Sequence, residues 1–139
     1  MSGQRHDLGA SFARLTRAMM AAETPILRAH DIEMWDYAVL SALEDAAAPT
    51  QSELAAAVYR DKTRLIPILD RLEARRLVTR TPDPADRRNR VIALTDEGRA
   101  VLTACRTAIR AMEADFLAAI PADRRRTFVE VLDQLTDLL

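Results

Sequence analysis

Ten basic side chains stand close together between residues 60 and 90, against only five acidic ones. The basic set is Arg60, Lys62, Arg64, Arg71, Arg75, Arg76, Arg80, Arg87, Arg88 and Arg90, and the acidic set is Asp61, Asp70, Glu73, Asp83 and Asp86. This segment therefore has a net charge of +5 in a chain of −1, so the remainder carries −6. Positive charge concentrated in this way is typical of a surface that binds phosphate groups. A solvated Arg-rich surface is the alternative, because 19 of the 20 basic residues are Arg.

Two short helical segments position the first of these residues. Thr50 and Glu53 have the spacing of a capping box, which predicts a helix that begins at Thr50 and ends near Val58. Asp61 is a good N-cap for a second helix that extends to Glu73. The apolar residues of the second helix recur at helical spacing, at Leu65, Ile68, Leu69 and Leu72. This single apolar stripe leaves the start of the helix exposed, with Lys62, Thr63 and Arg64.

A β-hairpin is predicted after the second helix. Residues 77–80 and 90–94 read as short strands, and the turn-forming segment 81–89 lies between them. Thr95 then caps a new helix whose first turn holds Asp96 and Glu97, where the helix dipole favours acidic residues. Two short helices, a charged hairpin and a further helix form the pattern of a winged helix-turn-helix, so we expect binding to duplex DNA.

Several linked motifs in this order make the chain similar to the MarR (multiple antibiotic resistance regulator) family of bacterial transcription factors. The motifs are Gln51-Ser52-Glu53-Leu54-Ala55, Asp61-Lys62-Thr63, Leu69-Asp70-Arg71-Leu72-Glu73, Leu77-Val78, Asp83-Pro84-Ala85-Asp86-Arg87-Arg88 and Leu94-Thr95-Asp96-Glu97-Gly98. The resemblance implies a transcriptional regulator that dimerises through its first and last helices. We expect a repressor that binds an inverted repeat.

Two positions depart from the family pattern. At Tyr59-Arg60 the family usually has Gly followed by an apolar residue. A non-Gly residue in a left-handed turn costs on the order of 1 kcal/mol, so the turn is expected to be strained or rebuilt locally. Pro67 lies inside the second short helix, where it removes a backbone hydrogen bond and favours a kink. Relatives often carry Arg at this position, whereas a Pro ring can contact the methyl group of thymine.

Length and composition favour a single domain with a real core, because 49% of the 139 residues are hydrophobic. The predicted fold is mainly α with a small β-hairpin wing. Within one domain over 1–139, we expect a winged helix-turn-helix module over 32–94 and dimerisation helices in 1–31 and 95–139. No apolar run is long enough to span a bilayer, and the N-terminus lacks the apolar core of a signal peptide, so a cytoplasmic protein is expected.

Two helices are predicted in the part of the chain that precedes Thr50. The first covers about residues 8–29, with a bend at Pro25. The second closes at residues 46–49, and its expected inward face consists of Ile32, Trp35, Val39, Leu40 and Leu43.

Two more helices are predicted at the other end of the chain. One extends from Thr95 for about 24 residues, and the next follows Pro121 and continues to Leu139. Apolar residues that recur up to the last position favour a dimer in which both terminal segments pack across a two-fold axis. A helical cap within a monomer is the alternative.

The expected DNA contacts come from the second short helix and the wing. Arg is the commonest reader of guanine, and Lys or Thr can contact bases or phosphates, which favours Lys62, Thr63 and Arg64 at the helix start. A hairpin can lay an Arg along a narrow minor groove, which favours Arg87, Arg88 and Arg90 in the wing. One wing arginine is expected to be structural, paired with Asp86. Four more residues are candidates for phosphate contacts, with a solvated surface residue as the alternative for each: Gln51, Ser52, Arg75 and Arg76.

The resemblance also implies a ligand site where the dimerisation helices meet the winged module. In this chain the junction is expected to include Met19, Met20, His30, Trp35 and Tyr37. Aromatic rings, thioethers and an imidazole suit a flat aromatic or phenolic effector. Ordinary packing in the core is the alternative for the same residues.

Cysteine redox sensing and metal sensing are rival hypotheses. The lone Cys105 excludes an internal disulfide, and it lies on the apolar stripe of a long helix in register with Leu102 and Ile109. This register favours a buried structural thiol over a redox sensor. His6, His30 and Cys105 lack the spacing of metal ligands, so no metal or other cofactor is expected.

Catalysis is not expected, because three Gly, two His and one Cys supply neither a nucleophile with its base nor a phosphate-binding glycine loop. A winged-helix protein-interaction module with weak or lost DNA binding remains the second alternative. Tyr59, Arg60 and Pro67 are the residues that favour it.

Overall fold

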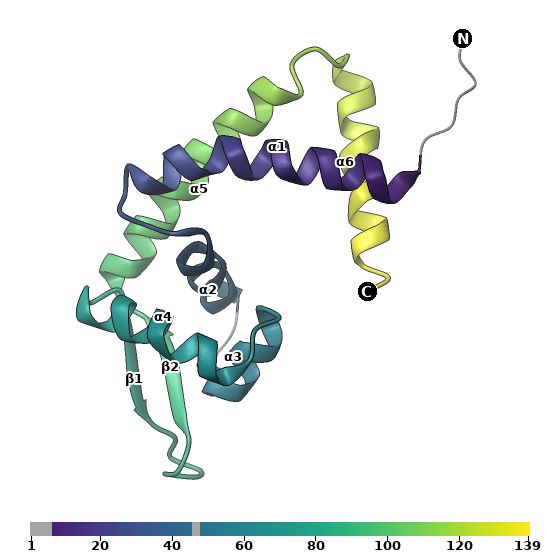
Figure 1. Ribbon diagram of the computed structural model, residues 1–139. Coiled ribbons are helices and arrows are strands. Elements are labelled where there is room, and N and C mark those ends of the chain that lie inside the picture. Colours follow the sequence, from purple (N-terminus) through teal and green to yellow (C-terminus); the bar gives the residue numbers. More distant parts are fainter. Residues whose placement is uncertain (1–6, 46–47) are drawn as a thin grey trace.

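The computed structural model describes residues 7–45 and 48–139. Within these ranges, helices and a two-stranded antiparallel sheet confirm the predicted helical fold with a hairpin wing (Figure 1). The elements are α1 (Leu8–Arg28), α2 (Met34–Asp45), α3 (Gln51–Ala57), α4 (Lys62–Ala74), β1 (Val78–Pro82), β2 (Arg90–Leu94), α5 (Asp96–Phe116) and α6 (Ala122–Thr136). No helix in the described ranges is long and apolar enough to cross a membrane. The expected closing residues 46–47 and residues 1–6 of the first segment lie outside these ranges.

Three predicted helix starts are confirmed by their capping hydrogen bonds. The Thr50 hydroxyl accepts from the Glu53 N–H at 3.2 Å, and the Thr50 N–H donates to the Glu53 carboxylate at 2.9 Å. The backbone hydrogen bond from Thr50 lowers the pKa of Glu53. Asp61 accepts from the Arg64 N–H at 2.8 Å, and Thr95 accepts from the Gly98 N–H at 2.9 Å. Each cap satisfies a backbone donor that has no partner inside its helix.

One hydrophobic core joins the winged helix-turn-helix to α5. Its fully buried side chains include Leu40, Leu54, Leu65, Leu69, Leu72, Ile92, Leu102 and Cys105. The hairpin is attached to the start of α3 as well, because the Ile92 N–H donates to the Pro49 carbonyl at 2.9 Å. The predicted inward face of α2 is correct except at Trp35, which is 37% exposed, while the adjacent Asp36 is buried.

Three predicted boundaries were wrong by a few residues. The first strand is Val78–Pro82 rather than 77–80, because Thr81 and Pro82 still pair with β2. The connection between the two strands is therefore shorter than predicted. Helix α5 ends at Phe116, before the expected break at Pro121, and residues 117–120 form turns. Helix α6 ends at Thr136 and does not continue to the last residue. Helix ends without a tertiary partner are held only by their own hydrogen bonds, and apolar periodicity does not locate them.

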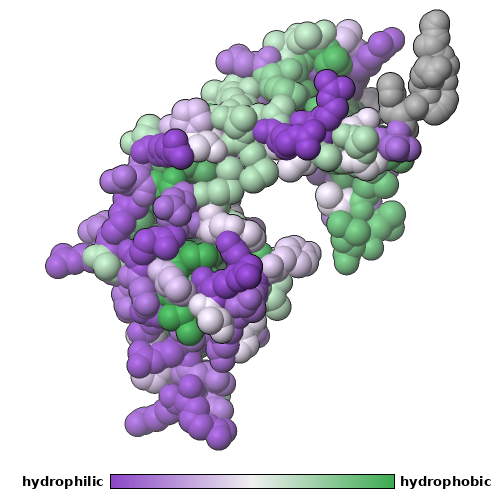
Figure 2. All heavy atoms as spheres, in the orientation of Figure 1, coloured by the Kyte–Doolittle hydropathy of each residue, from purple (hydrophilic) through white to green (hydrophobic). Residues whose placement is uncertain are grey.

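The wing and the terminal helices lie at opposite ends of the molecule (Figure 1). Helix α5 extends from the base of β2 to the far end, where α6 follows after a short turn, and α1 crosses α5 near its middle. We call α1, the second half of α5 and α6 the arm. Figure 2 shows hydrophilic surface over the wing and large hydrophobic areas over the arm.

Close packing at Gly98 joins α5 to the start of β1. A Cβ atom at Gly98 would lie 2.0 Å from the Leu77 carbonyl oxygen, so no side chain fits. The Thr95 N–H donates to the same oxygen at 3.1 Å, and the Thr95 hydroxyl donates to the Arg76 carbonyl at 2.6 Å. The first turn of α5 therefore lies directly on the backbone that connects α4 to β1.

We expect Gly98→Ala to lower the free energy of unfolding by roughly 1–3 kcal/mol, because overpacking displaces the backbone at Leu77. Urea denaturation measures the change. Gly9→Ala is the matched control, since nothing lies within 4 Å of a Cβ at Gly9 in α1. The control should be neutral or slightly stabilising, because Ala favours a helix. Equal stability of the two variants would contradict the close contact.

Candidate nucleic-acid interface

The exposed cationic residues of α4 lie at its N-terminal turn. Lys62, Thr63 and Arg64 are all exposed, as the buried stripe on the opposite face requires. Asp61 caps the helix, and its carboxylate also lies 3.6 Å from the Arg64 guanidinium. This pair is largely solvated, so it holds Arg64 only weakly. The positive end of the helix dipole adds to the charge of these side chains.

The turn between α3 and α4 is kept without glycine. Tyr59 adopts the left-handed conformation with φ of 57°. Its N–H donates to the Ala56 carbonyl at 3.2 Å, and the Arg60 N–H donates to the Ala55 carbonyl at 3.0 Å. These are the two hydrogen bonds of a Schellman motif. The turn is thus strained at Tyr59 but not rebuilt, and the helix-turn-helix geometry survives this departure.

Arg60 covers the exposed ring of Trp35. Its guanidinium carbon lies 3.8 Å from the ring centroid, a cation–π contact between the turn and α2. The Arg60 side chain is therefore committed to the fold, although it belongs to the cationic cluster of the sequence. Tyr59 points away from the core and is 89% exposed.

Pro67 does not interrupt α4, which is continuous from Lys62 to Ala74. Because Pro has no N–H, the Thr63 carbonyl four residues earlier has no helical donor. Pro67 and the preceding Ile66 are both exposed on the outer side of the helix. The side chains available in the middle of this face are therefore apolar.

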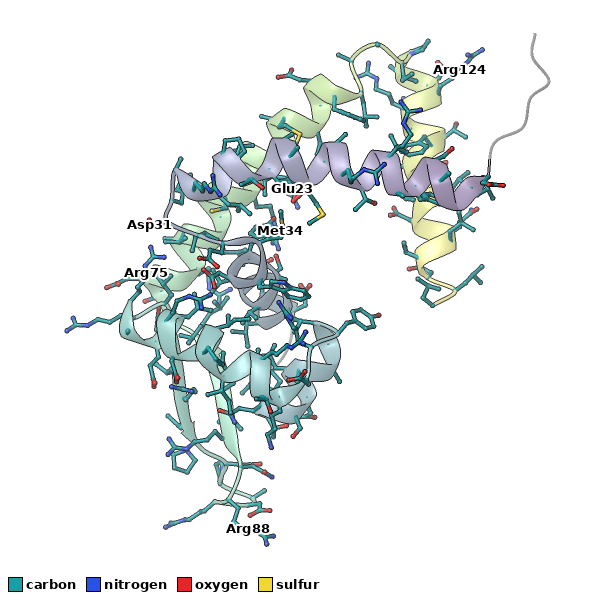
Figure 3. The ribbon with its side chains drawn as sticks, viewed as in Figure 1. Glu23, Asp31, Met34, Arg75, Arg88 and Arg124 are labelled. Atoms are coloured by element: carbon teal, nitrogen blue, oxygen red, sulfur yellow. The ribbon has the colours of Figure 1, made fainter. Side chains whose placement is uncertain are left out.

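The tip of the wing is held by its acidic residues. Asp83 accepts from the Ala85 N–H at 2.9 Å, and Asp86 accepts from the Arg88 side chain at 3.1 Å. The hydrogen bonds from Arg88 lower the pKa of Asp86. The expected structural partner of Asp86 is thus Arg88, which lies at the tip in Figure 3. Arg87 and Arg90 are exposed, and no described acidic side chain forms an ion pair with either.

Arg80 connects the wing to α4, a role that the sequence analysis missed. Its guanidinium lies 2.6 Å from Asp70 and 2.7 Å from Glu73, and its side chain is only 16% exposed. Burial disfavours the charge on Arg80, but the hydrogen bonds that Arg80 donates to these two carboxylates outweigh this effect and raise the pKa of Arg80. The only signal in the sequence was one Arg in a strand near two acidic residues of α4. Arg80 therefore fixes the wing relative to α4.

The remaining candidates fall into two groups. Gln51 lines a groove with Arg90 and Ile66, so it belongs to the same face as the wing, and Ser52 is exposed beside it on α3. Arg75 and Arg76 lie instead at the C-terminal end of α4. The Arg75 guanidinium donates to the carbonyls of Asp31 at 2.5 Å and His30 at 3.3 Å. Figure 3 shows Arg75 close to Asp31. The structure gives Arg75 a role in holding the α1–α2 turn.

A second missed pair couples α4 to α2. Asp36 is 3% exposed and accepts from the Arg71 guanidinium at 2.6 Å and from the Glu33 N–H at 3.0 Å. Burial of a carboxylate is unfavourable unless such hydrogen-bond partners compensate for the lost water. This pair borders a cavity of about 540 Å³ at the junction of the α1–α2 turn with α4. Any displacement of α4 relative to α2 would separate the pair.

The five candidate effector residues are not all brought together. Trp35 lies under Arg60, whereas Tyr37, two residues further along α2, points to a different side of the helix. The Tyr37 hydroxyl helps to raise the pKa of Arg106 on α5, after the larger contribution of Glu44. Met19 is half-buried and Met20 is 46% exposed on α1, and His30 Nδ1 lies 3.2 Å from the Ile26 carbonyl. A common pocket for these residues stays a prediction.

Cys105 is completely buried in the core between α5 and the winged module. Burial raises the pKa of its thiol, so the reactive thiolate is disfavoured. This environment favours the structural role over redox sensing.

Comparisons with known proteins agree with this geometry. Residues 30–89 match the model of the MarR family. The repressor NicR of Pseudomonas putida is 33% identical over 101 residues, which cover 73% of this chain and 64% of that protein. The transcriptional regulator HosA of Escherichia coli O111:H- is 31% identical over 105 residues, which cover 76% of this chain and 78% of that protein.

One solved structure shows a similar fold on DNA. The transcriptional repressor CouR, bound to a 23-mer DNA duplex, superimposes with a TM-score of 0.81 and is 25% identical. The match covers 94% of this chain and 92% of that chain. CouR comes from Rhodococcus jostii RHA1 and has also been solved with p-coumaroyl-CoA.

Proposed function

Because the chain belongs to the MarR family of transcriptional regulators, we propose that it is a homodimeric repressor that binds an inverted-repeat operator in duplex DNA and is released by a small aromatic or phenolic effector. The matched relatives are regulators rather than enzymes. The observation that carries the proposal is the set of exposed cationic side chains at the start of α4 and in the wing. Among them, Lys62, Arg87 and Arg90 form no ion pair with a described acidic side chain.

Only some of the ten basic residues of the segment 60–90 are proposed to contact DNA. Lys62, Thr63 and Arg64 enter the major groove at the start of α4, and Gln51 and Ser52 contact phosphates. Arg87 and Arg90 contact the backbone or the minor groove from the wing, while Arg88 supports the tip. We omit Arg75 and Arg76, because they lie at the opposite end of α4. The duplex bound by CouR supports this use of the fold.

The arm supports the dimer. No residue of α6 is buried, and every residue of this helix is described. Its large hydrophobic side chains are 43–48% exposed at Phe128, Val129, Val131 and Leu135. Leu138 and Leu139 are more exposed still. A second copy of the chain would remove this surface from water, and a two-fold axis would place two α4 helices for successive major grooves about 34–36 Å apart.

The effector part of the proposal rests on accessible apolar groups between the arm and the module. Met20 on α1 and Trp35 on α2 are both more than a third exposed, on helices that pack together. An aromatic ring and a thioether can hold a flat ring. CouR, which is 26% identical over 93% of this chain, binds p-coumaroyl-CoA. A phenolic acid or its thioester is therefore the effector class to test.

We expect Arg64→Ala to weaken binding to the operator by roughly 10- to 100-fold, because a specific base contact is worth about 1–3 kcal/mol. Fluorescence anisotropy on the inverted repeat nearest the protein's own gene, with scrambled duplex and varied salt, measures the effect. Scrambled duplex should lose much less affinity. Arg110→Ala, exposed on α5, is the matched control. Equal loss on both duplexes would make Arg64 a phosphate contact, and salt-independent binding of the wild type would contradict the proposed DNA interface.

We expect Leu135→Arg to produce monomers, because it places a charge on the apolar side of α6. Light scattering after size-exclusion chromatography measures the mass in solution. Asp133→Arg introduces the same side chain on the opposite side of α6 and should stay dimeric. A wild-type chain that is monomeric at micromolar concentration would refute the dimer.

We expect an effector to dissociate the complex of dimer and operator. Titration of hydroxycinnamic and hydroxybenzoic acids, with one coenzyme A thioester, into the preformed complex should lower its anisotropy at micromolar to millimolar concentration. Trp35→Ala should abolish the response with little change in DNA affinity, whereas Tyr59→Ala is a control for loss of an exposed aromatic ring. No release by the whole panel would remove this part of the proposal.

A further inference from the structure

Behind its cationic start, the outward face of α4 is apolar. Ile66 is 39% exposed, and Pro67 is exposed beside it. Thr63, Ile66, Pro67 and Asp70 have the i, i+3, i+4, i+7 spacing of one helix face. The opposite stripe of the helix is buried in the core. Two apolar side chains therefore occupy the middle of the face that the proposed function brings into the major groove.

The acidic groups near these two residues are already engaged. Asp70, at the far end of the face, is held by Arg80 at 2.6 Å. Ile66 also lines a groove of about 440 Å³ between α4 and the wing, together with Gln51, Glu73, Arg80 and Arg90. Glu73 is bound to Arg80 as well. Ile66 and Pro67 themselves have no side-chain donor or acceptor, and Pro67 has no N–H.

The base edges of the major groove offer one apolar group, the 5-methyl of thymine. The other groups there are hydrogen-bond donors and acceptors, apart from ring C–H groups such as the cytosine C5–H, which project less far than the methyl group. If Ile66 or Pro67 covered a donor or acceptor of a base, that polar group would lose its hydrogen bonds to water without gaining a hydrogen bond to the protein, which is unfavourable. The pair can thus favour one base and disfavour the others.

We propose that Ile66 and Pro67 select a thymine in each operator half-site by packing against its 5-methyl group. This inference rests on the proposed DNA-binding function and adds the class of base that the middle of α4 recognises. The cationic start of the helix supplies affinity and further base contacts, while the apolar pair supplies discrimination without hydrogen bonds.

Uracil substitution tests the proposal, because it removes only the methyl group and leaves base pairing unchanged. Duplexes are first enriched from a random library by the wild-type dimer, and each thymine of the enriched duplex is then replaced singly by deoxyuridine. Anisotropy should show about fourfold weaker binding when uracil removes a contacted methyl group. We expect such an effect at one or two positions in each half-site. All other thymines should tolerate uracil.

The double variant Ile66→Ala, Pro67→Ala assigns the contact. It should bind the thymine duplex about as weakly as the wild type binds the uracil duplex, and it should no longer distinguish the two. Lys62→Ala is the matched control on the same helix, and it should bind both duplexes more weakly while keeping their ratio. Thermal unfolding verifies that each variant is folded. If the double variant does not fold, the single variants Ile66→Ala and Pro67→Ala assign the contact, and a wild type without any uracil effect overturns the proposal in either case.

Three outcomes overturn the inference. If binding is tight and no uracil substitution changes it, α4 contacts no thymine methyl group. The proposed DNA-binding function would remain supported in that case. Uracil sensitivity that persists in the double variant would assign the methyl contact to another residue. Failure to enrich any sequence would overturn the proposed function and this inference together.

Discussion

The contact between the first turn of α5 and the Leu77 carbonyl fixes the geometry on which the rest of the structure depends. Gly98 allows the approach, and Thr95 donates hydrogen bonds to Leu77 and Arg76. The end of α4, the start of β1 and the start of the arm therefore meet at one point. Since α4 and the wing leave this point on one side and α5 leaves it on the other, the contact couples the direction of α5 to the position of α4 and the wing. A ligand held between arm and module would act on the same joint.

Local features of the fold could be predicted because they depend on a few neighbouring residues. Capping at Thr50, Asp61 and Thr95 involves partners three residues away, and each expected hydrogen bond is present. Apolar periodicity located the buried stripe of α4 for the same reason. It failed at Trp35 and Asp36, because the partner that makes burial of the carboxylate favourable is Arg71, 35 residues away. No local pattern indicates such a pairing.

Left-handed turns show how tertiary packing overrides local preference. Asp31, Tyr59 and Arg76 all have φ near 60°, and no described glycine has a positive φ. Each is followed by a buried or core-covering residue whose N–H donates back to the preceding helix, at Ile32, Arg60 and Leu77. These hydrogen bonds, together with the burial of Ile32 and Leu77, stabilise conformations that cost about 1–2 kcal/mol per residue. The sequence predicted the strain at Tyr59, but the packing that tolerates it was visible only in the fold.

The DNA-facing surface owes its charge to how the acidic residues are used. Asp70 and Glu73 bind Arg80, and Asp86 binds Arg88, so that these carboxylates hold the wing in place. The exposed cations then lie at the start of α4 and along the wing, where the sequence predicted them. The sequence charge alone could not separate Arg75 and Arg76 from these residues. Only the fold shows that Arg75 and Arg76 lie at the end of α4 opposite to Lys62 and Arg64, and that Arg75 holds the α1–α2 turn. Loss of Arg80 would therefore do more than remove one positive charge, since it would remove the link between the wing and α4 and leave two carboxylates unpaired on the face that the proposed function turns toward DNA.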